Sequence, residues 1–157
     1  ILVGIVTVQS VTGFIPLDKK ADVTLDGQGW KHAVEQLISA DIHQKGSTFL
    51  FTNKWYTGGE LAYAAGQQMT TTVLNSSNPH GFAFWIDQSD LLGKDGIFVT
   101  TERYPFDPAE IFQGHFDSFE QLENIITRRP FGEGQTFHVW ICRNFHTAVD
   151  YRYGMNR

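Results

Sequence analysis

Cysteine is almost absent from this sequence, and its scarcity excludes two kinds of site. The 157 residues include a single cysteine, Cys142, so no disulfide can form within the chain and no cysteine-based zinc site is available. Cys142 lies in a run where apolar residues alternate, which predicts that it packs as a small hydrophobic side chain. A domain without disulfides is compatible with either a reducing or an oxidising compartment.

Basic residues are few, and this argues against a nucleic-acid partner. The chain has 12 Lys and Arg against 17 Asp and Glu, which gives a net charge of −5. A nucleic-acid-binding protein would present a basic face toward the phosphates, yet 128–129 is the only pair of adjacent arginines. We expect a solvated, mildly acidic surface and no nucleic-acid binding.

Catalytic and cofactor motifs are also missing. The histidines lack metal-ligand spacing, and neither G-x-S-x-G nor S-x-x-K occurs. Residues 27–29 begin like a dinucleotide-binding loop, but His32 replaces the third glycine. Cys142 and His146 are four residues apart at the end of a strand, so they lie at different positions along it and not in hydrogen-bond contact. The sequence therefore predicts no metal, no cofactor and no complete catalytic constellation.

What the sequence does contain is enough apolar residues for one folded core. Hydrophobic residues make up 41% of the chain and aromatic residues 14%, which excludes a disordered segment. The length fits one domain. We expect an apolar opening segment at 1–17, a polar, glycine-containing linker at 18–29, and a single α/β soluble domain at 30–157.

The opening segment, residues 1–17, is uncharged and lacks the basic start of a signal peptide. Its length is at the lower margin for crossing a bilayer. Two interpretations remain, because periodicity does not separate them: the end of a membrane helix, or a buried β-branched strand over 1–8. A start without methionine favours a helix whose beginning has been cut away.

The rest of the chain alternates strand and helix patterns. Helical spacing from Trp30 predicts an amphipathic helix that ends before Gly46. We expect strands at 47–52, 70–74 and 96–101, further helices at 58–65 and 108–116, and a loop or edge strand at 79–87. From Gln135 the apolar residues alternate as in a strand, after a glycine-containing hairpin turn. This order predicts an α/β fold with a three-layer Rossmann-like sheet, mostly parallel, and an antiparallel C-terminal hairpin at one edge.

The most suggestive stretch for ligand binding is 53–60, where a strand ends and a helix begins. Ligands of open α/β sheets bind outside the carboxyl ends of strands, and a helix N-terminus attracts anions. Trp55 and Tyr56 would stack on a sugar or lipid headgroup and Lys54 would contact a phosphate. The alternative is structural: Glu60 complements the helix dipole and the aromatic residues cover the edge of the sheet.

Four segments together resemble a known family: GFIPLDKKADVTLDGQGW (13–30), FTNKWYTGGELAYAAG (51–66), NPHGFAFWIDQSDLLGKDGIFVTTE (78–102) and TFHVWICRNF (136–145). They resemble the C-terminal soluble region of bacterial membrane glycosyltransferases related to the dolichyl-phosphate-mannose protein mannosyltransferases. The resemblance covers nearly the whole chain. What it shares are patterns of packing and turns, and not a catalytic signature.

The resemblance implies a role without catalysis. Such enzymes take a sugar from a polyprenyl-phosphate donor, and their catalytic carboxylates lie in an extracytoplasmic loop outside this chain. The domain would then be periplasmic and anchored to the membrane part of its own chain, where it covers the active site or helps to recognise the acceptor. Residues that would touch the polyprenyl-phosphate sugar or the acceptor are Lys54, Trp55, Glu60, Trp85 and Asp87. Lys19 and Lys20, just after the apolar segment, would favour the cytoplasmic side of the membrane. Because Asp18 and Asp22 flank them, this signal is weak and the periplasmic assignment is kept.

Two other functions stay open. The chain could be a free-standing α/β binding module for a small anionic or sugar ligand. It could also be an independent hydrolase built on Glu60, Asp87 and a distant histidine, which requires that these groups meet in one cleft.

Overall fold

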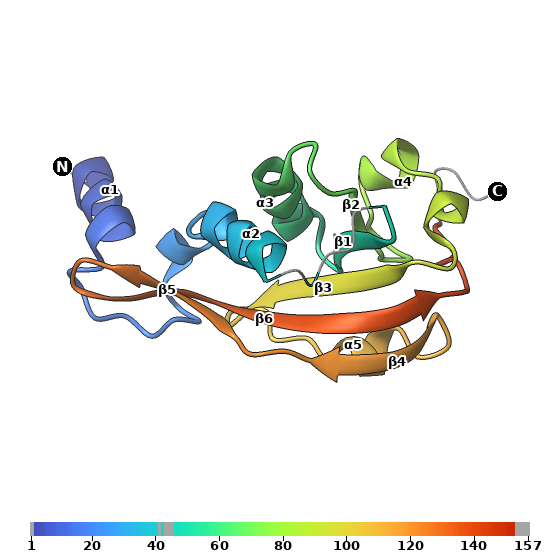
Figure 1. Cartoon of the computed structure of the whole chain (residues 1–157). Helices are drawn as coiled ribbons and strands as arrows, with labels where there is room; N and C mark the ends of the chain where they lie inside the picture. Colours follow the sequence, from blue (N-terminus) through green and yellow to red (C-terminus); the bar gives the residue numbers. More distant parts are fainter. Residues whose placement is uncertain (1, 41, 43–45, 153–157) are drawn as a thin grey trace.

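The computed structural model describes residues 2–40, 42 and 46–152 of the chain. Its helices are α1 (Leu2–Thr12), α2 (Trp30–Ser39), α3 (Trp55–Ala65), α4 (Phe82–Trp85) and α5 (Pro108–Ile111), with 3-10 turns η1 (Val23–Leu25) and η2 (Gln88–Leu91). Its strands are β1 (Thr48–Thr52), β2 (Thr71–Val73), β3 (Asp95–Thr101), β4 (Phe116–Gln121), β5 (Ile125–Arg129) and β6 (Gly132–Phe145). Among these residues the strands form one mixed six-stranded sheet in the order β2-β1-β3-β6-β4, with β5 paired to β6 (Figure 1). The predicted α/β class is confirmed.

Strand direction divides the sheet into two parts. β1 runs parallel to both β2 and β3, whereas β6 runs antiparallel to β3, β4 and β5. The sheet is therefore mixed rather than mostly parallel. The cause is the 14-residue length of β6, which pairs with β3 along one side and with β4 and β5 in succession along the other.

The predicted hairpin is formed by β5 and β6. The last pair in their register is Arg129 with Gly132, so the turn consists of Pro130 and Phe131. Beyond the turn, β6 continues between β3 and β4. Strand β5, the first strand of the hairpin, shares the outer edge of the sheet with β4, whereas β6, the second strand, lies inside the sheet.

Helices α2 and α3 cover one face of the sheet (Figure 1). The core under them is mainly aliphatic and buries Trp30, Ala33, Val34, Leu37, Leu50, Leu61, Ala65, Ile97, Val99 and Val139. Helix α3 approaches β2 very closely: a Cβ on Gly58 would lie 2.2 Å from Cγ2 of Val73. A glycine at this position therefore sets the distance between the helix and the sheet.

The opposite face of the sheet is aromatic. Its buried cluster includes Phe49, Phe51, Phe98, Phe112, Phe116, Phe145, Cys142 and Tyr151. Cys142 is fully buried there, which confirms the prediction of a small packed side chain, and burial raises the pKa of its thiol. The segment after β6 is fastened to this face because Tyr151 donates a hydrogen bond to the carbonyl of Val73 at 2.8 Å.

Several predicted elements need correction. Residues 79–87 contain the short helix α4 instead of an edge strand. The helix predicted at 108–116 ends at Ile111, because Gly114 adopts a positive φ of 87° and Phe116 already begins β4. The helix predicted at 58–65 begins earlier, at Trp55. Strand β4 was missed, since most of its side chains are exposed and show no apolar alternation.

The opening segment forms a helix over Leu2–Thr12, which is one of the two structures expected for it. Helix α1 lies at one end of the molecule, beside the turn of the β5–β6 hairpin (Figure 1). The stretch 18–29, expected as a linker, contains η1 and the buried side chains of Asp22 and Leu25. Among the described residues, no helix combines the length and the apolar content needed to cross a membrane.

Candidate functional site

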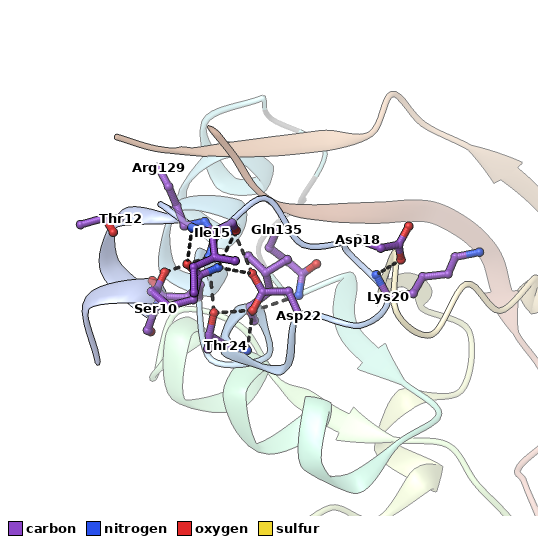
Figure 2. A network of polar contacts seen from close by, with 12 residues as sticks. Ser10, Thr12, Ile15, Asp18, Lys20, Asp22, Thr24, Arg129 and Gln135 are labelled. Atoms are coloured by element: carbon purple, nitrogen blue, oxygen red, sulfur yellow. Dashed lines mark hydrogen bonds and ion pairs between the residues drawn. The ribbon is translucent and has the colours of Figure 1, made fainter. Parts of the chain in front are cut away.

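A buried ion pair fastens the N-terminal segment to the β5–β6 hairpin (Figure 2). Nη2 of Arg129 lies 3.0 Å from Oδ2 of Asp22, and the two side chains are 10% and 1% exposed. The backbone N–H of Thr24 donates to Oδ1 of Asp22 at 3.0 Å. Burial acts to raise the pKa of the Asp22 carboxyl, but the hydrogen bonds from Thr24 and Arg129 outweigh it and hold that pKa below its ordinary value.

The network extends to the end of helix α1. Gln9 donates from Nε2 to Oδ2 of Asp22 at 3.2 Å, and Arg129 donates to the carbonyl of Gln9 at 3.2 Å. A guanidinium at this end of a helix also complements the helix dipole. Gly13 has a positive φ of 65°, and a Cβ on it would lie 2.7 Å from Nε of Arg129. Glycine is therefore required where the arginine passes over the helix end.

Apolar side chains of α1 are exposed on all sides. Leu2 is 75% exposed and Val3 78%, and the same holds to a lesser degree for Ile5, Val6, Val8 and Val11. Among the described residues of α1 the buried one is a polar residue, Gln9. At the tip of the hairpin Phe131 is 73% exposed, and its N–H donates to the carbonyl of Thr12 at 3.0 Å. This end of the molecule thus combines a buried charge pair with an exposed apolar surface.

The sequence-predicted site residues separate into two groups. Trp55 and Trp85 each lie near the loop that contains His80 and Gly81: the ring of Trp55 is 4.5 Å from that of His80, and a Cβ on Gly81 would lie 3.0 Å from the Trp85 ring. Both tryptophans are exposed, at 44% and 68%. Lys54 joins this group at the start of α3, but its ammonium lies 4.9 Å from the ring centre of Phe106.

Glu60 and Asp87 have other surroundings. Glu60 lines a cleft of about 680 Å³ together with Lys31, His32, Glu35 and Tyr63. Asp87 accepts a hydrogen bond from the N–H of Ser89 at 3.0 Å and so caps η2. The structure therefore places Trp55 and Trp85 near neighbouring residues of one loop, whereas Glu60 and Asp87 do not line one cleft.

A third region was missed by the sequence analysis: a pocket of about 390 Å³ beyond the carboxyl ends of β1 and β2. Its lining includes Asn53, Asn75, His115 and Asp150. Asn53 is 6% exposed, and its Oδ1 has no hydrogen-bond partner among the described residues. The available signal was the position of an asparagine directly after a buried strand, at the end where open α/β sheets bind ligands.

Tyr56, the neighbour of Trp55, faces inward rather than toward a ligand. Its ring lies 5.3 Å from that of Tyr104. Burial, together with a hydrogen bond that the Tyr56 hydroxyl donates to Tyr104, raises the pKa of Tyr56 to about 12, so its phenol stays protonated at neutral pH. Within residues 2–40, 42 and 46–152, no three His, Cys, Asp or Glu side chains gather closely enough to hold a metal ion.

The fold and these regions define an α/β protein with a mixed sheet, an apolar helix at one end and a ligand-sized pocket beside its parallel strands. No protein-family model, curated protein or solved structure matches this chain. Function is therefore argued from the surfaces themselves.

Proposed function

We propose that this chain is a non-catalytic, extracytoplasmic lobe of a polytopic membrane glycosyltransferase that uses a polyprenyl-phosphate-linked sugar. In this role helix α1 anchors the lobe to the membrane part of its own chain, and the lobe covers the active site or aids acceptor recognition. The observation that carries the proposal is the reversed polarity of α1, which buries Gln9 and exposes its leucine and valines.

A helix that is apolar on all sides is stable only in a core or in a membrane. Helix α1 contains no charged residue, and Val3 and Val11 are 78% and 61% exposed. Water is therefore a poor environment for most of its surface, since each exposed apolar side chain forgoes roughly 1.5–3 kcal/mol of burial free energy. A bilayer, or further membrane helices of the same protein, would cover it.

The residues beside α1 suit a membrane interface. Phe14 and Phe131 are exposed there, at 45% and 73%, and aromatic side chains are enriched at the headgroup level. Lys19 lies near the hairpin as well, because its Nζ donates to Oγ1 of Thr136 at 2.8 Å. The same Nζ forms an ion pair with the carboxylate of Glu133, so this lysine ties the segment after α1 to the hairpin. The buried pair of Asp22 and Arg129 would fix the angle between the anchor and the lobe.

The glycosyltransferase assignment is supported by the resemblance of the segments 51–66 and 78–102. In the structure these segments supply β1, α3 and the exposed pair of tryptophans 55 and 85. Aromatic faces of this kind stack on sugar rings, so this surface is suited to a saccharide donor or acceptor. We include in the proposal that β1, α3, β2 and β3 form a Rossmann-like unit within a three-layer arrangement.

Vesicle binding tests the anchor. We expect the chain to sediment with phosphatidylethanolamine–phosphatidylglycerol vesicles, and the double variant Val3→Asn with Val6→Asn to remain in the supernatant. Leu92→Asn is the matched control, because Leu92 is similarly exposed at 45% but lies between η2 and β3. Equal sedimentation of the double variant and the wild type would contradict the anchor.

The open reading frame upstream of Ile1 tests the parent enzyme. We expect many hydrophobic spans and an acidic pair in the first extracytoplasmic loop. A single span, or none, would contradict a polytopic glycosyltransferase.

A second candidate function is the free-standing α/β binding module. The pocket beside Asn53 favours it, since 390 Å³ is within the range of small-molecule sites. The two functions differ in what they require of α1: a free-standing module has no use for an exposed apolar helix, so unchanged ligand binding together with absent vesicle binding would support it.

A further inference from the structure

The pocket beyond β1 and β2 contains one side-chain atom that the folded chain leaves unsatisfied. Phe49 and Phe51 of β1 are buried on the aromatic face, and the period of two places the next alternate residue, Asn53, on that same face. Asn53 lines the pocket together with Phe112, and only 6% of its surface is exposed. Its Oδ1 is an acceptor without a partner among the described residues. A buried acceptor of this kind destabilises the fold unless a ligand supplies a donor.

Neighbouring polar groups are already used inside the protein. The amide of Asn75 donates to the carbonyl of Asn53 at 2.7 Å, and its Oδ1 accepts from the N–H groups of Ser77 and Asn78 at 3.0 and 3.1 Å. The carbonyl of Ser76 accepts from a backbone N–H at 3.0 Å. Asn75 therefore shapes the rim of the pocket, and Oδ1 of Asn53 is left for a ligand.

The other polar groups at the pocket are acceptors too. Nδ1 of His115 lies 2.8 Å from the carbonyl of Thr147, and a carbonyl can only accept, so Nδ1 carries the hydrogen and Nε2 of the neutral ring is an acceptor. Asp150, which also interacts within the chain, contributes a carboxylate to the lining. Of the described residues that line the pocket, none is Lys or Arg. The site thus offers acceptors and negative charge to its ligand.

We propose that this pocket binds the ammonium group of a small organic amine, with Oδ1 of Asn53 as the buried acceptor. A primary ammonium carries three N–H donors, which match the acceptors supplied by Asn53, His115 and Asp150. Its alkyl part would lie against the apolar lining formed by Leu74, Phe112 and Val149. This site is independent of the membrane anchor and lies on residues that the anchor does not use.

A titration with n-propylammonium chloride, followed by ¹⁵N–¹H correlation NMR, tests the site. We expect saturable shifts of the Asn53 and Asn75 amides. Tetramethylammonium chloride at the same ionic strength has the charge but no N–H donor, so it should cause no saturable shift. Equal effects of the two salts, or saturable binding of glucose in place of the amine, would overturn the proposal.

Two substitutions of Asn53 change the affinity in opposite directions. Asn53→Leu should weaken n-propylammonium binding at least about tenfold, while the unliganded protein stays folded because Oδ1 has no hydrogen bond to lose. Asn53→Asp is isosteric and adds charge, so it should tighten binding several-fold and serves as the test if the leucine variant fails to fold. Unchanged affinity in both variants would show that Oδ1 does not contact the amine.

Charge is tested separately. Asp150→Asn should weaken binding about fivefold, because a partly exposed charge pair contributes modestly. Glu123→Gln makes the same charge change at an exposed residue outside the pocket and should leave the affinity unchanged. Equal loss in the two variants would mean that only the net charge of the protein matters, which contradicts a formed site.

Discussion

Helices α1 and α3 have the same length and opposite relations to water. Each has 11 residues. Helix α3 buries Leu61 and Ala65 against the sheet, whereas the buried residue of α1 is Gln9 and its Leu2 and Val3 face outward. The difference teaches that apolar content does not decide which side chains become buried: a helix also needs an apolar surface to lie on.

The two helices are consequently held by different forces. Helix α3 is held by packing, which is so close at Gly58 that no side chain fits. Helix α1 is held at its last turn by the polar network of Gln9, Asp22 and Arg129. Removal of a polar side chain should therefore destabilise the end of the molecule that carries α1. Addition of side-chain volume should destabilise the packing of α3 on the sheet.

The largest expected effect is at the ion pair. Arg129→Ala would leave the Asp22 carboxylate buried without its cation and should lower the free energy of unfolding by about 3–5 kcal/mol, measured by urea denaturation. The control is Lys31→Ala, which removes an exposed pair with Glu35 at 3.9 Å and should cost less than about 0.5 kcal/mol. Equal losses in the two variants would show that burial of the Asp22–Arg129 pair has no energetic weight.

Two adjacent glycines test the packing of α3. Gly58→Ala should destabilise the protein by about 1–3 kcal/mol, because its methyl group would overlap Val73. Gly59→Ala should stabilise it by about 0.5–1 kcal/mol, since nothing lies within 4 Å of the added carbon and alanine favours the helix. Thermal unfolding of both variants measures the effect, and a shared sign would contradict the close contact between α3 and β2.

Acid should loosen the α1 end first. The pKa of Asp22 is lowered in the folded state, so its ionised form contributes stability that is fully present above the unfolded pKa of about 3.9 and is lost as the pH falls through the lower folded value. Asp22→Asn should be less stable than the wild type at pH 7, with a difference that narrows below about pH 4. A constant difference from pH 7 to pH 2 would exclude this linkage.

The smallest effect is expected on the outer surface of α1. Val3→Asn should change the free energy of unfolding by less than about 0.5 kcal/mol, because Val3 is 78% exposed and makes little contact with the lobe. Leu61→Ala in α3 is the counterpart and should cost about 2–5 kcal/mol. A large loss from Val3→Asn would mean that α1 packs against the protein after all.

Elements with a strong local signal were predictable. The run 47–52 has three apolar residues, Phe49, Leu50 and Phe51, between two threonines, and Thr48–Thr52 became β1. The helical spacing from Trp30 became α2. Strand β4 was not predictable, because at the sheet edge its burial pattern is mostly exposed and its paired residues in β6 lie 19 to 29 positions further along the chain. The exposed pair of tryptophans was foreseen as two residues, but their common loop was not.

The sequence by itself determined the α/β class, the burial of Cys142 and the apolar character of residues 2–12, because composition and short-range periodicity act over a few neighbouring residues. Only the tertiary structure decided the place of β6 between β3 and β4, the pairing of Asp22 with Arg129 across 107 positions, and the unsatisfied Oδ1 of Asn53. These depend on which distant segments meet, and no local pattern records whether a polar atom finds its partner there.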